Sequence, residues 1–206
     1  FKVSNYYSLA STLDPKNYDL CSKWLEKAGD FIVANGLVDT RNHAVWHNLV
    51  GGHASRGFEM GLFDVFPHSC VAHFEEAVRI HDEKLGSKVD NREDVHFRHV
   101  MMCLASVTTD EALNKILLQG AITPDIEKTC FRIKGTMAFE LTDEVLVLPN
   151  GSPDHYRRAD CWQIRSRIAL LEGDFLAARE AIDNAEREME ASISITGATG
   201  QLSKLL

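Results

Sequence analysis

Apolar residues recur through this chain at intervals of three and four, the spacing of one face of an α-helix. The clearest run is Leu171, Phe175, Ala178, Ile182, Ala185 and Met189, with acidic residues and arginines on the opposite face. Alternating, strand-like patterns are scarce. The run EVLVLPNG, at 144–151, is the one candidate, and a single strand has no partner to pair with, so we interpret it as a helix end and a loop. We therefore predict an all-α protein.

The helices we expect are separated by short connections, and the five prolines lie where a helix could begin or has just ended. The predicted helices cover 14–28, 30–38, 42–57, 67–86, 92–107, 109–119, 124–146, 154–172 and 174–194. Short connections make neighbouring helices antiparallel. About nine helices in sequence then predict an alpha-alpha superhelix, a stacked array of hairpins. We treat 1–206 as a single helical-repeat domain that is a fragment of a longer protein.

Charge and cysteine content restrict the partners and the compartment. The net charge is -8, and the 22 basic residues are scattered, which argues against nucleic acid and anionic membranes as partners. No window approaches eighteen apolar residues, so we expect no membrane segment. The cysteines are odd in number and lie in apolar surroundings: Cys21, Cys70, Cys103, Cys130 and Cys161. This favours reduced core thiols in a cytoplasmic protein.

The stretch HAVWHNLVGGH, at 43–53, has the histidine spacing of the zinc motif H-E-x-x-H-x-x-G-x-x-H. Ala44 replaces the general-base glutamate, and Val50 replaces the turn glycine. His53 could join His43 and His47 only if the helix breaks at 51–52, since ten residues of helix are about 2.8 turns. A metal-binding or hydrolytic protein that uses the histidine-rich half, 43–99, stays open as the alternative function.

Two further histidine patterns occur in the same half. HFRH, at 96–99, places two histidines three apart, and we expect a solvated helix face there because no third metal ligand has an identifiable position. In HFEE, at 73–76, Phe74 and Ala77 assign the inner face of the helix to packing. No glycine loop suited to a phosphate is present, so we expect no nucleotide hydrolysis. Since the histidine patterns lack a general base and a third metal ligand, we predict no catalytic residue, no metal and no cofactor.

The segment ADCWQIRSRIALLEGDFLAAREAIDNAEREME, at 159–190, is the best-formed internal unit. Small residues at Ala169, Ala178 and Ala185 would let two helices approach closely, and Gly173 would permit a sharp turn. Trp162 and Phe175 would fill the wedge between hairpins. With Trp162 at its fourth position and alanines at its eleventh, twentieth and twenty-seventh, the unit resembles a tetratricopeptide repeat. It departs from that pattern at Arg165 and Ser166, where leucine and glycine are usual.

Looser copies lie upstream. WLEKAGDFIVANGL repeats the glycine turn at 29–31, and VHFRHVMMCLASVTTDEALNKILL forms a degenerate hairpin. WHNLVGGHASRGF and CVAHFEEAVRIHDEKLG together resemble the longer repeats of kinesin light chains and of fungal and bacterial nucleotide-binding receptor proteins. The resemblance implies that Trp46, Leu49 and His53 are packing residues, whereas His47 points into a concave groove.

The resemblance implies a non-enzymatic scaffold or sensor module for protein–protein interaction, which binds a peptide or helix of a partner in the concave groove. The groove positions carried over from the family are His47, Phe97, Met101, Gln163 and Arg167. Arg167 is expected to be an exposed cation that meets a carboxylate of the ligand. Self-association through the last helix is a third hypothesis.

Overall fold

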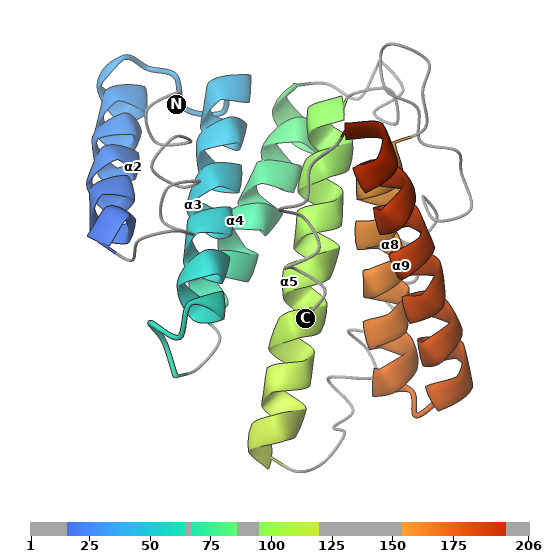
Figure 1. Ribbon diagram of the computed structural model, residues 1–206. Helices are drawn as coiled ribbons and strands as arrows, with labels where there is room; N and C mark the ends of the chain where they lie inside the picture. The colour runs from blue at the N-terminus through green and yellow to red at the C-terminus, as the bar shows by residue number, and fades with distance from the viewer. Residues whose placement is uncertain (1–15, 65–66, 86–94, 120–153, 197–206) are drawn as a thin grey trace. The chain divides into compact units, whose positions relative to one another are not determined.

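The computed structural model describes residues 16–64, 67–85, 95–119 and 154–196 (Figure 1). They form α2 (Lys16–Ala34), α3 (Arg41–Glu59), α4 (His68–Arg79), a π-helical turn η1 (Ile80–Lys84), α5 (Val95–Gln119), α8 (His155–Leu171) and α9 (Phe175–Thr196). No strand occurs in these residues, which confirms the all-α prediction there. The superhelix and the nine helices stay predictions, and the helix expected at 124–146 and the run at 144–151 lie outside the described residues.

The chain divides into two compact units, Phe1–Val107 and Thr108–Leu206, which we describe separately. In the first unit, α3 packs against both α2 and α4 (Figure 1). A cluster of buried side chains from α4 and the first half of α5 forms its core: Cys70, Val71, Phe74, Ala77, Val100 and Val107. Residues 70, 74 and 77 share one helical face, as an amphipathic helix requires. The burial of Phe74 and Ala77 was predicted and is confirmed.

The turn predicted at 29–31 is wrong, because α2 continues to Ala34. A glycine within a helix costs about 1 kcal/mol relative to alanine, which packing can offset. Gly29 faces the indole of Trp46, and a Cβ there would lie 2.8 Å from Trp46 Cζ2. The glycine therefore permits close approach of α3. The chain turns instead at Gly36, whose φ of 63° closes the helix with a Leu37 N–H to Ile32 carbonyl bond of 2.9 Å.

The helix boundary predicted at 108 is also wrong, since α5 runs without interruption from Val95 to Gln119. Thr108 and Thr109 are buried within it. The low helix propensity of threonine costs no more than about 0.7 kcal/mol per residue, which burial readily outweighs.

In the second unit, α8 and α9 form the antiparallel hairpin that the sequence predicted (Figure 1). Gly173 adopts a φ of 78°, and the Asp174 N–H donates to the Ala169 carbonyl at 2.9 Å, so the turn closes as it does after α2. Ala169, Ala178 and Ala185 are buried, which confirms their assignment to close packing.

The apolar stripe of α9 is narrower than predicted. Its buried residues are Ala178, Ala181, Ala185 and Met189. Phe175 is 74% exposed and Ile182 43% exposed, so the prediction that Phe175 fills a wedge is wrong within the described residues. Trp162 is half-buried, with the Arg165 guanidinium 5.2 Å from its ring centre. The spacing of apolar residues predicted the helix correctly, but it did not separate the residues that are buried against α8 from the exposed apolar residues beside them.

Candidate functional site

The stretch at 43–53 lies inside α3, which continues through Gly51 and Gly52 to Glu59. His43 and His47 therefore share one face, with ring centres 4.6 Å apart, while His53 points elsewhere. His53 is buried, stacks on Tyr18 of α2 at 3.8 Å, and lies 2.8 Å from the Ser22 hydroxyl oxygen through Nε2. The packing role predicted for His53 is confirmed.

His47 faces α4. Its Nδ1 lies 2.8 Å from Nδ1 of His73, at a distance where one imidazole donates a hydrogen bond to the other. The indole of Trp46 contacts both rings edge-on, at 4.8 Å from His47 and 5.8 Å from His73. Burial lowers the pKa of His47 to about 4, and the neighbouring His43 and His73 act in the same direction. Burial also lowers the pKa of His73. Both rings are therefore neutral near pH 7.

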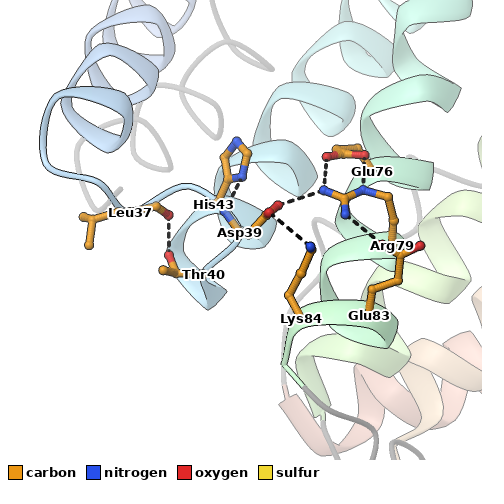
Figure 2. Close-up of polar contacts among 8 residues, drawn as sticks. All are labelled: Leu37, Asp39, Thr40, His43, Glu76, Arg79, Glu83 and Lys84. Atoms are coloured by element: carbon orange, nitrogen blue, oxygen red, sulfur yellow. Dashed lines mark hydrogen bonds and ion pairs between the residues drawn. The ribbon is translucent and has the colours of Figure 1, made fainter.

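Beside this pair, the Arg79 guanidinium holds three carboxylates (Figure 2). It donates to Glu76 at 2.6 and 2.8 Å, to Glu83 at 3.0 Å and to Asp39 at 2.8 Å. The Asp39 carboxylate also lies 3.7 Å from the Lys84 ammonium. The hydrogen bonds from Arg79 lower the pKa values of Glu76 and Asp39.

Asp39 links the turn after α2 to both α3 and α4. Its backbone lies in the left-handed region, with a φ of 59°, which aspartate tolerates better than most residues. Its N–H donates to His43 Nδ1 at 3.1 Å, and its carboxylate contacts Arg79 (Figure 2). Thr40, the next residue, donates its hydroxyl to the Leu37 carbonyl at 2.6 Å. The turn is thus fixed to two helices at once.

We call the set Asp39, His43, His47, His73, Glu76 and Arg79 the histidine–arginine cluster. Its acids are paired with its arginine, and two of its imidazoles are paired with each other, so its groups stabilise one another. Among the residues that the structure describes, no three His, Cys, Asp or Glu side chains are placed to hold a metal ion.

Sequence reasoning placed His47, Phe97 and Met101 on a binding face. In the structure His47 is hydrogen-bonded to His73. Phe97 is buried, with its ring 5.4 Å from that of His81, and Met101 is half-buried. Neither His47 nor Phe97 presents much surface to a partner.

The other two residues of that set lie in the second unit, on α8. Gln163 is half-buried. Arg167 is not the free cation that the sequence suggested, because its Nη1 lies 3.2 Å from the Asp110 carboxylate. The binding role of all five residues stays a prediction.

The remaining histidine and cysteine predictions have mixed outcomes. His96 does not lie on a solvated face, because its Nδ1 is 2.8 Å from Nε2 of the buried His81. Cys21, Cys70 and Cys161 are buried and in no disulfide bond, as predicted. Cys103 is only half-buried, with its Sγ 3.6 Å from Nε2 of His99, and Cys130 lies outside the described residues. Burial raises the pKa of Cys161 to about 12, so its thiol is inert near neutral pH.

A surface that the sequence analysis missed lies on α2. Leu20 and Trp24 are each 40% exposed, and Phe31 is 61% exposed. Their spacings of four and seven residues place them on one helical face, which we call the α2 stripe. The spacing was visible in the sequence, but a turn predicted at 29–31 separated Phe31 from the other two. None of the described helices has the length and apolar character to cross a membrane.

Comparison of the chain with models of protein families, with curated protein sequences and with solved structures gives no match in any of the three.

Proposed function

We propose that the chain is a non-enzymatic interaction module, built from tetratricopeptide-like helical hairpins, that binds an amphipathic helix or peptide of a partner protein. The observation that carries the proposal is the α2 stripe, formed by Leu20, Trp24 and Phe31. Aromatic side chains that stay exposed on one face are the type of residue that contributes most to protein–protein binding.

The position of the stripe on α2 supports this assignment. The buried face of the helix consists of Cys21, Leu25 and Ile32, one residue further along than Leu20, Trp24 and Phe31. Successive residues are rotated by about 100° around a helix, so the stripe adjoins this buried face. The α2 residues that contact α3 include Tyr18, Ser22 and Gly29, each two positions before a stripe residue, so the stripe faces away from α3. The apolar surface of α2 therefore extends beyond the face that contacts α3. A second helix lying along the stripe would bury it.

The charges along the stripe suggest the chemistry of the partner. The Lys27 ammonium lies 4.9 Å from the ring centre of Trp24, and Lys23 is exposed beside it. A cation held over an indole next to open apolar surface favours a ligand that combines apolar side chains with a carboxylate. We therefore assign the partner segment as an acidic amphipathic helix. The α2 stripe is a different surface from the groove positions that the family resemblance implied.

The hairpin of α8 and α9 supports the repeat type of the module. A glycine turn at Gly173 with buried alanines at 169, 178 and 185 is the arrangement that a tetratricopeptide unit uses for close helix contact. Phe175, exposed at the start of α9, is then available to a neighbouring hairpin. Repeat units of this kind bury their flanks by stacking.

The test uses displayed libraries of amphipathic helices selected against the full chain, followed by measurement of Kd for a selected peptide. Phe31→Glu should weaken binding by about 30-fold or more, the range of an interface hot spot. Val33→Glu is the matched control, since Val33 is 68% exposed on the opposite face of the same helix, and it should change Kd less than about twofold.

Three results would count against the proposal. Equal effects of the two variants would remove the stripe from the binding site. Selection of peptides without acidic residues would remove the charge argument. Concentration-dependent dimerisation of the free chain that Phe31→Glu abolishes would show that the stripe joins two copies of the chain.

A further inference from the structure

We propose that the first unit is an acid-sensitive element, whose packing of α2 on α3 holds only while His53 is neutral and whose packing of α4 on α3 holds only while at most one of His47 and His73 is charged. Two interfaces carry such contacts. His53 joins α3 to α2 through Ser22, and His47 joins α3 to His73 of α4. The inference concerns the packing of the unit and is independent of the partner proposed above.

The hydrogen bonds between α2 and α3 determine which nitrogen of the neutral His53 ring carries the proton. The Ser22 hydroxyl donates to the Tyr18 carbonyl at 3.2 Å, and a hydroxyl has one proton to donate. The Ser22 oxygen therefore accepts from Nε2 of His53, which assigns the proton of the neutral ring to Nε2. Nδ1 is then an acceptor, buried with no hydrogen-bond partner among the described residues. A proton added at Nδ1 would create a buried donor without an acceptor.

The groups around His53 do not compensate an added charge. Burial, followed by the positive charge of Arg56 on the same helix, lowers the pKa of His53 to about 4. The carboxylate of Asp19 on α2 acts in the opposite direction, but less strongly. The ring stacked on His53 belongs to Tyr18, whose hydroxyl pKa is raised to about 12 by burial. That phenol stays neutral and supplies no counter-charge.

The interface between α3 and α4 can hold one proton between its two facing nitrogens, but not two. While both rings are neutral, one Nδ1 carries that proton and donates it to the other Nδ1 at 2.8 Å, and a first added proton on Nε2 of the donating ring leaves the bond intact. When both rings are charged, two N–H donors face each other. His43 on α3 and Arg79 on α4 oppose the added charge, and Glu76 favours it. Glu76 is already engaged by Arg79. Two charged side chains of η1 are likewise engaged, Glu83 with Arg79 and Lys84 with Asp39.

The direction of the pH effect follows from proton linkage. These histidines have lower pKa values in the folded chain than the usual 6.5, so their contribution to stability is complete above pH 6.5. It is lost as the pH falls from 6.5 towards 4. Between pH 6.5 and 5, carboxylates with ordinary pKa values stay ionised, so the histidines dominate this range.

The second unit supplies an internal control. His155 of α8 faces Glu188 of α9, with Nδ1 2.7 Å from the carboxylate, and Arg158 contacts the same carboxylate at 2.9 Å. An added proton on His155 meets an acceptor there. The contact between α8 and α9 should therefore persist where the first unit opens.

Native-state hydrogen exchange of the full chain, corrected for the intrinsic rate at each pH, tests the inference. The opening constant of α3 amides should rise between pH 6.5 and 5, by up to about tenfold per pH unit for each histidine that takes up a proton. The opening constant of α9 amides should change less than about twofold. His53→Gln, which keeps a hydrogen-bond donor but cannot titrate, should reduce the rise in α3.

The inference is overturned if α3 opening changes less than twofold over this pH range in the wild-type chain, whatever the variant does. It is also overturned if α9 opens in parallel with α3, because the effect would then not arise from the interhelical imidazoles. A His53→Gln chain that folds and retains the full pH dependence would remove His53 from the mechanism.

Discussion

Two adjacent glycines in α3 offer a sharp test of the packing in the first unit. A Cβ built on Gly51 would lie 2.8 Å from Cε2, 2.9 Å from Cδ2 and 3.1 Å from Cζ of Phe74. A Cβ on Gly52 would meet nothing within 4 Å. The Phe74 ring is 2% exposed and belongs to the core cluster, so it cannot move aside without disturbing α4. The two positions differ in their surroundings and share their helix.

The size of the effect follows from two opposing contributions. Replacing glycine by alanine within a helix stabilises by about 1 kcal/mol at either position. Overpacking of a filled core costs about 1 to 3 kcal/mol, and it applies to Gly51→Ala alone. Gly52→Ala should therefore raise the stability of the first unit, while Gly51→Ala should lower it or leave it unchanged. The difference between the variants, in which helix propensity cancels, should be about 1 to 3 kcal/mol.

Hydrogen exchange of the slowest α3 amides measures this difference, since it reports the opening of the first unit by itself. A third variant locates the cause. In the Phe74→Leu background, the smaller side chain should reduce the penalty of Gly51→Ala, so that the two changes are less than additive. Equal stability of Gly51→Ala and Gly52→Ala would refute the argument, because the close contact between α3 and Phe74 would then be absent.

Three further predictions concern the second unit. Ala178→Leu should destabilise the hairpin of α8 and α9 by about 1 to 3 kcal/mol in urea unfolding, whereas Glu180→Leu on the exposed face should cost little; equal costs would remove the assigned register. Arg167→Glu should lower stability through repulsion of Asp110, and addition of Asp110→Lys should restore about 0.5 to 1 kcal/mol in a double-mutant cycle; a zero coupling would exclude the ion pair. At pH 8 the alkylation of Cys161 by iodoacetamide should be at least about 100-fold slower in the folded chain than in the unfolded chain, as measured by mass spectrometry of the peptide that contains Cys161. Rapid alkylation of Cys161 in the folded chain would contradict its burial.

Residues that lie close together in the sequence were sufficient to predict the hairpin of α8 and α9. Gly173 and the alanines at 169, 178 and 185 lie within one short segment, and each has a local reason for its identity. The same reasoning failed at Gly29, where a glycine followed by aspartate suggested a turn. The reason for that glycine is the indole of Trp46, which reaches it from another helix. A single sequence does not show whether a glycine forms a turn or makes room for a side chain of another helix.

The candidate site was harder to predict, because its contacts join residues far apart in the chain. His47 and His73 are 26 residues apart, and Asp39 and Arg79 are 40 apart. His47 was predicted to point into a groove, since nothing local in the sequence indicates that the His73 imidazole faces it. Arg167 was predicted to be an exposed cation, because its Asp110 partner lies on a helix that is distant in sequence.

The most direct test of the proposed function follows the indole N–H signals of the chain by nuclear magnetic resonance while the selected acidic peptide is added. The chain has three tryptophans, so each signal can be assigned by single substitution to phenylalanine. Trp24 lies in the α2 stripe, whereas the Trp46 indole donates to the Leu25 carbonyl at 2.8 Å and Trp162 lies on α8. We predict that the peptide shifts the Trp24 signal in a saturable way and leaves the Trp162 signal in place. A saturable shift of Trp162 with no change at Trp24 would contradict the proposal that the chain binds its partner through α2.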